Sequence, residues 1–505
     1  MRAYFSQGLF GRDLLGSVVV FLVALPLCMG IAIASGMPPS AGLITGIVGG
    51  IIVGSIAGSP LQVSGPAAGL AVLVFELVRE HGVAALGPVV LLAGLIQIVA
   101  GLCKVGVWFR MTSPAVVAGM LSGIGILIVA SQSHVLLDAI PKARGLENFA
   151  ALPSAAWESV TGAAEGQAPA ALMIGLGTIA IMLGWEKLRP AKLRFVPGAL
   201  LAVVAMTLIA QLTAVDVKRV DVPANLFSAV SLPSMGSLFG LFDASLLVAA
   251  ATFAFIASAE TLLSAAAVDR MHNGVRTNYD RELTAQGVGN LICGFLGALP
   301  MTGVIVRSAA NVQAGSATRM ASILHGGWLL AFVMLLPWLM RMTPISCLAG
   351  ILVFTGVKMV NPGQIKTLAA YGKGTAAVYV ATTVAIVATD LLTGVIVGFG
   401  LSLFRLALLS SKLKMDVQHH DEPGQATLHL EGSATFLKVP TMARKLEAVP
   451  ANTRLSVRMD RLVHVDQASL ELLREWGQNA SKRGCELVVD WHELGRRVEG
   501  SRQAA

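Results

Sequence analysis

Long apolar runs, separated by short polar connections, occupy the chain from residue 12 to residue 410. Fourteen of them have or approach the roughly 20-residue length that an α-helix needs to cross a bilayer. The predicted spans are 14–35, 39–57, 65–79, 86–103, 112–131, 169–185, 196–213, 244–266, 283–298, 304–314, 320–340, 344–359, 374–390 and 391–410. The pattern therefore predicts an all-α membrane protein with fourteen transmembrane segments.

Two of these runs, 65–79 and 304–314, are too short to cross the membrane alone as complete helices. Fourteen segments divide into seven plus seven, and because seven is odd, the second half must insert upside down relative to the first. The short third segment then corresponds to the short tenth segment. We infer an inverted-topology repeat from this topology and not from internal sequence identity.

Each short run follows or contains a stretch broken by proline, glycine and hydroxyl residues, at 59–68 and at 299–311. Paired interruptions in corresponding places of two halves indicate a transporter's midplane binding site. Half-helices that begin there direct unpaired N–H groups and positive dipole ends at an anion, and Arg307 adds a full charge. The candidate substrate-binding residues are Gln62, Ser64, Gly65, Ala67, Ala68, Thr302, Val306, Arg307 and Ser308.

Glu260 is the other charged residue inside a predicted span. A charge at a helix centre costs about 2.5–3.5 kcal/mol on insertion scales, which makes it a functional hypothesis. Ser264 follows four residues later on the same helix face. We expect Glu260 and Ser264 to couple proton movement to anion movement in the cavity that Arg307 faces. The alternative is a structural Glu260–Arg307 bridge. His325 is expected to hydrogen bond between helices.

Composition narrows the class of protein. Only 13% of the residues are charged, against about 25% in soluble domains. The net charge of +8 comes from basic residues at the ends of apolar runs, which argues against nucleic-acid binding. The five cysteines are scattered, so we expect no disulfide framework, metal site or cofactor. With no nucleophile–base pair or metal constellation, an enzyme is not expected.

Basic residues mark one side of the membrane. Lys104, Arg270 and Lys358 lie in connections that the fourteen-span count places on the same face, and an excess of lysine and arginine indicates the cytoplasm. The first run is too long for a signal-peptide core and is interpreted as a retained span. We therefore expect both termini in the cytoplasm.

The pattern changes after the last run. The sequence predicts a membrane domain at 1–411, a polar linker at 412–424 and a small α/β domain at 425–505, where strand-like and helical stretches alternate. Asp466 is the expected N-cap of a helix over 467–480.

Several of these stretches resemble the SulP family of anion transporters. They are the first-span residues 13–41, Ser59-Pro60 with Gln62-Val63-Ser64-Gly65-Pro66, Ser258 to Ala265 around Glu260, and Pro300 to Asn311 followed by Ala314-Gly315. The C-terminal region resembles the STAS domain that usually follows in this family. The resemblance covers nearly the whole chain.

The resemblance implies core and gate domains in a seven-plus-seven arrangement, an anion between the third and tenth segments, and a homodimer. The first-span residues resemble bacterial members found alongside carbonic anhydrase-like domains, which implies bicarbonate as a candidate beside sulfate. We expect a multi-pass protein of the bacterial inner (cytoplasmic) membrane. A STAS domain implies a cytoplasmic location and a partner there. Related signalling domains carry a phosphorylatable serine two places after the aspartate, whereas Asp466 is followed by Gln467 and Ala468, so we expect no such switch.

Family members carry sulfate, bicarbonate, chloride, oxalate or dicarboxylates. Sodium-coupled bicarbonate members have a small residue at the position of Arg307 and an aspartate at that of Glu260, and this chain departs from both. We therefore expect a secondary active transporter of sulfate or bicarbonate, by proton symport or anion exchange, with an elevator-type motion. The alternatives are a sodium-coupled bicarbonate transporter, a dicarboxylate/proton symporter, a passive anion channel, a membrane-tethered signalling protein and a nucleobase transporter.

Overall fold

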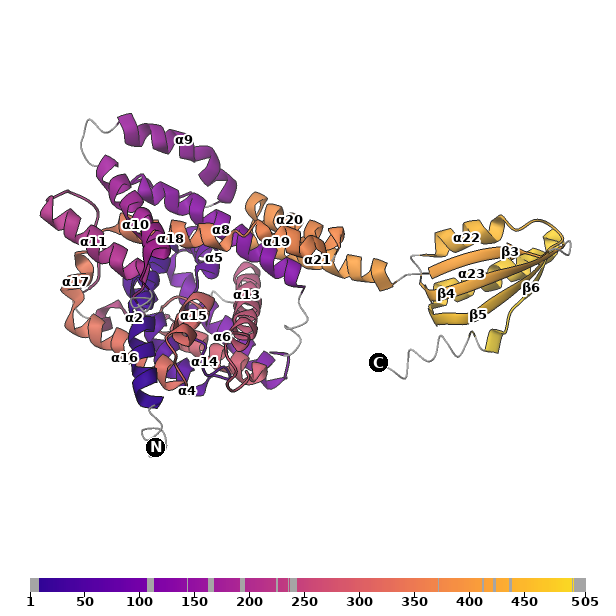
Figure 1. Cartoon of the computed structure of the whole chain (residues 1–505), viewed down its shortest axis with the longest axis horizontal. Helices are drawn as coiled ribbons and strands as arrows, with labels where there is room; N and C mark the ends of the chain where they lie inside the picture. Colours follow the sequence, from indigo (N-terminus) through magenta and orange to yellow (C-terminus); the bar gives the residue numbers. More distant parts are fainter. Residues whose placement is uncertain are drawn as a thin grey trace. The chain divides into compact units, whose positions relative to one another are not determined.

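The structure, a computed structural model, divides into two compact units, Met1–Phe399 and Gly400–Ala505 (Figure 1). The residues it describes are 9–106, 113–142, 144–161, 168–190, 196–223, 226–234, 236, 243–370, 372–410, 413–420, 424–435, 438–492 and 494. Parts of the predicted domains, including residues 1–8, 411–412, 421–423 and 495–505, lie outside the described residues.

The first unit is helical. Its helices up to the middle of the unit are α2 (Leu9–Ala34), α3 (Pro39–Val48), the π-helix η1 (Gly49–Val53), α4 (Gly54–Ile56), α5 (Ala68–His81), η2 (Val83–Ala85), α6 (Leu86–Leu102), α8 (Pro114–Leu136), α9 (Gly145–Thr161), α10 (Ala168–Leu188), α11 (Gly198–Leu212) and η5 (Leu226–Ala229). They are followed by α13 (Ala244–Asp269), α14 (Tyr279–Phe295), α15 (Ile305–Gln313), α16 (Met320–Leu335), α17 (Pro337–Arg341), α18 (Ile345–Met359), α19 (Gly363–Ala370), α20 (Lys373–Ala388) and α21 (Leu391–Ser410), the last of which crosses the boundary between the units.

Eight helical segments among the described residues are long and apolar enough to cross a membrane, and α11, α16 and α20 are shorter apolar helices. The short runs at 65–79 and 304–314 form α5, with 14 residues, and α15, with 9 residues. The mostly helical, apolar architecture agrees with the predicted class of membrane protein, whereas the count of fourteen spans in two inverted halves stays a prediction.

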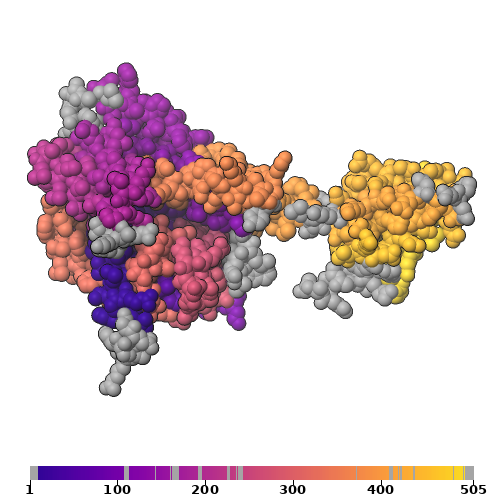
Figure 2. All heavy atoms as spheres, in the orientation of Figure 1, coloured from indigo at the N-terminus to yellow at the C-terminus, as the bar shows by residue number. Residues whose placement is uncertain are grey.

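Helices far apart in sequence pack closely in this unit. α6 packs along α14, α8 along α18 and α20, and α2 along α16. Figure 2 shows the indigo atoms of α2 beside the later, orange-coloured segments on the viewed face. Between α6 and α14, a β-carbon on Gly287 would lie 2.6 Å from the backbone nitrogen of Ile98, so only glycine allows this approach.

A two-stranded sheet lies within the helical unit. Strand β1 (Ser64–Pro66) pairs antiparallel with β2 (Met301–Gly303), and all six residues are buried. Ser64 faces Gly303, Gly65 faces Thr302 and Pro66 faces Met301. The two interruptions that the sequence places about 240 residues apart are therefore neighbours.

The second unit contains a four-stranded sheet in the order β3-β4-β5-β6, formed by β3 (Leu413–His419), β4 (Gln425–Ala434), β5 (Arg454–Val465) and β6 (Glu486–Val488). β3 is antiparallel to β4, and the other pairs are parallel. The helices are α22 (Val439–Glu447), α23 (Gln467–Ala480) and the one-turn η8 (Ser481–Arg483). The predicted alternation of strands and helices is present.

One prediction for this unit differs from the structure and one is confirmed. β3 occupies most of the predicted linker 412–424, because Leu413, Met415 and Val417 alternate and pack against the core of the unit. Asp466 is the N-cap of α23, and its carboxylate accepts the N–H of Ser469 at 2.8 Å.

Candidate functional site

The β1–β2 pair sets two helix N-termini side by side. α5 begins at Ala68 directly after β1, and α15 begins at Ile305 directly after β2. Their N-cap residues, Ala67 and Val304, provide no side-chain hydrogen bond to the first turn. Helix N-termini carry unpaired N–H groups and a partial positive charge. The site is therefore bordered by two uncapped, electropositive helix starts.

Further hydrogen bonds hold the two crossing segments together. The N–H of Val304 donates to the carbonyl of Val63 at 2.9 Å, and the N–H of Val63 donates to the hydroxyl of Ser308 at 2.9 Å. The side chain of Asn311 donates to the carbonyl of Leu61 at 2.9 Å. Buried backbone groups need such partners, and the short strands alone do not supply them.

Arg307 lies in the first turn of α15 and is fully buried. Its guanidinium lies against Gly65, where any β-carbon would collide with Nη1. Nη2 donates a long hydrogen bond of 3.5 Å to the carbonyl of Pro66, while Nε and Nη1 have no partner among the described residues. A buried guanidinium with unused donors is suited to an anion, because an unpaired buried charge is costly.

Glu260, on α13, approaches the start of the other half-helix, α5. Its carboxylate lies against Gly69, where a β-carbon would be 2.9 Å from Oε2 and 3.1 Å from Oε1. Oε2 has no hydrogen-bond partner among the described residues, and no ion pair joins Glu260 to Arg307 there. The alternative of a structural Glu260–Arg307 bridge is thus not seen in this conformation. Ser264, one turn further along α13, is buried.

The polar residues at the interruptions divide into two groups. Gln62 donates to the carbonyl of Thr261 at 3.0 Å, Ser64 accepts from the side chain of Gln286 at 2.5 Å, and Ser308 bonds to backbone groups. The side chains of this first group are therefore already used in hydrogen bonds within the protein. The hydroxyl of Thr302 is buried without a partner among the described residues.

The remaining candidates also lie at the two helix starts. Ala67 is buried and Ala68 is partly buried at the beginning of α5, whereas Val306 is half exposed on α15. The structure therefore brings all nine candidate positions to the two adjacent interruptions. Their roles in substrate binding stay predictions.

His325 on α16 is buried, and neither ring nitrogen has a hydrogen-bond partner among the described residues. The predicted interhelical hydrogen bond is wrong. The ring lies beside η1, where a β-carbon on Gly50 would be 3.0 Å from Nδ1.

One stripe of polar residues on α14 supports the site and was not recognised in the sequence. Asn290 accepts the N–H of Met301 at 2.7 Å and donates to the carbonyl of Met301 at 3.1 Å, which fixes β2. Gln286 reaches Ser64, and Glu282 accepts the N–H of Ser59 at 2.8 Å. The stripe consists of polar residues at intervals of four, Glu282, Gln286 and Asn290. This spacing places them on one face of an apolar predicted span, and it could have indicated the stripe from the sequence.

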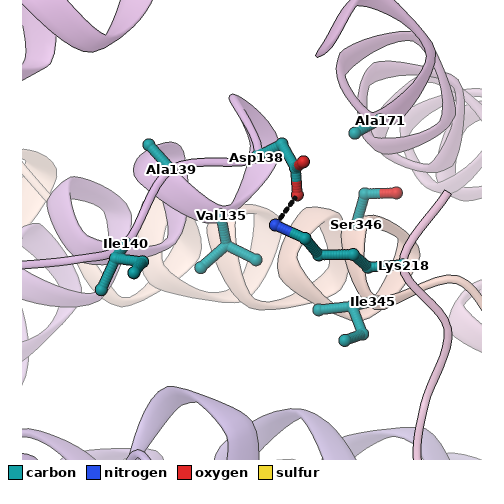
Figure 3. Close-up of a pocket in the computed structure, with 8 residues that line it drawn as sticks. All are labelled: Val135, Asp138, Ala139, Ile140, Ala171, Lys218, Ile345 and Ser346. Atoms are coloured by element: carbon teal, nitrogen blue, oxygen red, sulfur yellow. Dashed lines mark ion pairs between the residues drawn. The ribbon is translucent and has the colours of Figure 1, made fainter. Parts of the chain in front are cut away.

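A small cavity of about 90 Å³ lies elsewhere in the first unit, at the end of α8 and the start of α18 (Figure 3). Asp138 and Lys218 form an ion pair there, with 2.8 Å between Oδ1 and Nζ. None of the predicted site residues lines it. Among the described residues, no group of three His, Cys, Asp or Glu side chains could hold a metal ion.

Comparisons with known proteins identify the family to which the chain belongs. The model of the Sulfate permease family matches residues 10–382. A putative sulfate transporter of Bacillus subtilis, YvdB, is 26% identical over 493 residues, which cover 94% of this chain and 90% of that protein. The bicarbonate transporter BicA of Synechocystis is 28% identical over 431 residues, covering 81% of this chain and 72% of that protein.

Two solved structures are similar to this chain. The transmembrane domain of a cyanobacterial bicarbonate transporter BicA matches with a TM-score of 0.67 and 27% identity, covering 76% of this chain and 97% of that chain. The structure of SLC26A9 matches with a TM-score of 0.75 and 16% identity, covering 97% of this chain and 86% of that chain. The second likeness shows the fold alone.

Proposed function

Because this chain belongs to the Sulfate permease family of membrane anion transporters, we propose that it is a secondary active transporter of sulfate or bicarbonate. The observation that carries the proposal is the fully buried guanidinium of Arg307, which lies where two uncapped helix starts meet. Two of its nitrogens have no partner in the part of the chain that the structure describes. An anion placed there would meet the donors that the protein leaves unused.

The charge at this point suits a small anion. Each helix N-terminus contributes about half a positive charge, so two starts and one guanidinium give about two positive equivalents. That matches a divalent anion, or a monovalent anion with Glu260 ionised. The count therefore supports both sulfate and bicarbonate and does not choose between them.

Glu260 is the proposed coupling residue. Its carboxylate lies against Gly69, at the helix start where the anion would bind, so the two negative charges compete for one electropositive position. A proton on Glu260 removes that competition, and this links proton and anion movement. The fixed positive charge of Arg307 already compensates the charge of the bound anion, so a sodium ion is not needed there. We therefore place sodium coupling behind proton coupling.

The proposal also covers the architecture of the transporter, its motion and its place in the cell. We propose fourteen spans in two inverted halves, with core and gate domains that move by an elevator-type motion, in a homodimer of the bacterial inner membrane. Both termini lie in the cytoplasm in this proposal. The second unit is proposed to be a STAS domain with a cytoplasmic partner, supported by its mixed four-stranded sheet and its two longer helices.

Uptake by proteoliposomes tests the proposal. The purified chain is reconstituted, and uptake of radiolabelled sulfate, bicarbonate and succinate is measured under an imposed pH gradient, an imposed sodium gradient, or neither. We expect one of the two inorganic anions to accumulate above its equilibrium level only with the pH gradient, or to exchange with internal anion. Sodium-dependent accumulation, preference for succinate, or purely passive flux would each replace the proposal with the corresponding alternative.

A further inference from the structure

Helix α9 (Gly145–Thr161) presents apolar side chains on the face turned away from the protein. Leu146 is 53% exposed, Phe149 is 40% exposed and Trp157 is 70% exposed. Ala150 and Pro153 are also exposed and complete the row. These five residues, hereafter the α9 stripe, follow the i, i+3, i+4, i+7, i+11 spacing of one helix face.

The opposite face packs on the protein and carries small or polar side chains. Asn148, Ala155 and Ser159 are buried, at the i, i+7, i+11 spacing of one face. α9 is therefore reversed relative to an ordinary surface helix, whose apolar face points inward. Figure 1 shows α9 at the edge of the helical unit, with no other element drawn beyond it.

Specific hydrogen bonds fix this reversed orientation. The side chain of Asn148 accepts the N–H of Lys142 at 2.8 Å and donates to the carbonyls of Lys142 and Arg144 at 2.9 and 3.0 Å. The ring Nε2 of His134 on α8 lies 3.0 Å from the carbonyl oxygen of Asn148. α9 cannot roll its stripe inward without breaking these bonds.

α9 also has a polar edge, which bears on whether its apolar stripe faces a membrane or open water. Glu147, Ser154 and Glu158 are exposed along one edge of the helix, again at the i, i+7, i+11 spacing. The other edge carries Leu152 and Ala156. A helix whose outward side has one polar edge beside an apolar stripe is suited to the boundary between headgroups and acyl chains, where tryptophan is also enriched.

α9 packs against helices that are apolar enough to lie in a bilayer. α20 has 16 residues, which span about 24 Å, less than the roughly 30 Å of a hydrocarbon core. α9 begins beside the last turn of α20, since a β-carbon on Gly145 would lie 3.1 Å from the carbonyl of Val387. From there it runs along α8, which is long enough to cross.

We infer that the α9 stripe is a lipid-binding surface, which contacts acyl chains and headgroups of the leaflet at which α8 ends. The polar edge with Glu147 and Glu158 faces water. In this arrangement α9 fills the space beside the short helix α20 and fixes this part of the first unit in the bilayer.

Spin labels on the full chain in nanodiscs test the inference. Cys103 is exposed and is replaced by Ser, and the other four cysteines are buried. Phe149→Cys and Trp157→Cys report on the stripe, and Ser154→Cys and Glu158→Cys are matched controls on the polar edge. We expect the ratio of oxygen to water-soluble nickel-chelate accessibility to be severalfold higher at 149 and 157 than at 154 and 158.

Two outcomes would overturn the inference. Equal ratios at all four sites would show that the stripe faces water. Low accessibility to both reagents at 149 and 157 would show a protein cover, such as a second copy of the chain. If labelled variants fail to fold, the conservative Trp157→Phe variant serves instead. Brominated lipids should then quench a larger fraction of the tryptophan emission in the wild type than in the variant. The same fractional quenching in both proteins would contradict lipid contact at Trp157.

Discussion

The guanidinium of Arg307 occupies the space that a β-carbon on residue 65 would need. Gly65 is thus required by close approach, and Gly65→Ala should displace the charge from the start of α5. A lost hydrogen bond to a charged group costs about 1.5–3 kcal/mol, so we expect the KM for anion uptake to rise by about tenfold or more. Concentration-dependent uptake by proteoliposomes measures this.

Gly327→Ala is the matched control, because no heavy atom lies within 4 Å of a β-carbon built on Gly327. Its KM should stay close to that of the wild type. An unchanged KM in Gly65→Ala would show that the position of the guanidinium does not matter for binding.

Glu260→Gln tests the coupling step. The variant keeps the size of the side chain but cannot ionise, so it no longer competes with the anion in a proton-dependent way. We expect accumulation driven by a pH gradient to be abolished while exchange of internal for external anion continues. Glu80→Gln, at an exposed position near the end of α5, should behave like the wild type. Persistent proton-driven accumulation in Glu260→Gln would refute the coupling role.

Asn290 should contribute to stability through its bonds to Met301. Asn290→Ala leaves the N–H and carbonyl of a buried strand residue unpaired, and each orphaned group costs about 1–3 kcal/mol. We expect a lower midpoint in thermal unfolding of the detergent-solubilised chain, whereas Asn273→Ala, at an exposed position, should change little. Equal midpoints for the two variants would show that β2 is held by other contacts.

Asp243, the N-cap of α13, should make the stability of the chain depend on pH. The N–H of Ser245 donates to its carboxylate at 2.9 Å, and this bond, with a second from the Ser245 hydroxyl, holds the pKa of Asp243 below its ordinary value of 3.8. Because the pKa of Asp243 is lower in the folded chain, its carboxylate stabilises the folded state at any pH above the ordinary pKa. This contribution is lost as the pH falls through the lower pKa of the folded state. The difference in unfolding midpoint between wild type and Asp243→Ala should therefore shrink in acid, and a difference that grows there would contradict this reasoning.

The sequence was informative where one residue breaks a strong pattern. Proline and glycine interrupt apolar runs at 59–68 and 299–311, and Arg307 is a charge in such a stretch, so both interruptions could be located from the sequence. Their role in anion binding stays a prediction. The expectation that the two interruptions form one site came only from the assumed inverted repeat, and their pairing as strands β1 and β2 was not predicted. The exact register, which places Gly65 opposite Thr302, depends on tertiary contacts that no local pattern encodes.

Other features could not be derived in this way. The polar stripe of Glu282, Gln286 and Asn290 is visible in the sequence, but its partners are not. Glu282 accepts the N–H of Ser59 and Gln286 donates to the hydroxyl of Ser64, both more than 200 residues away, whereas Asn290 accepts the nearby N–H of Met301. β3 was missed because an edge strand of seven residues with polar outer positions resembles a linker. α9 was missed because its 17 residues include a proline and fall within a connection between predicted spans.

Equilibrium binding of the transported anion to Arg307→Ala and Arg307→Lys tests the central claim most directly. The account predicts that Arg307→Ala weakens binding by at least about tenfold and that Arg307→Lys, which keeps the charge but not the fork of donors, lies between it and the wild type. Arg270→Ala, at an exposed position after α13, should bind like the wild type. A wild-type dissociation constant in a correctly folded Arg307→Ala variant would contradict the account.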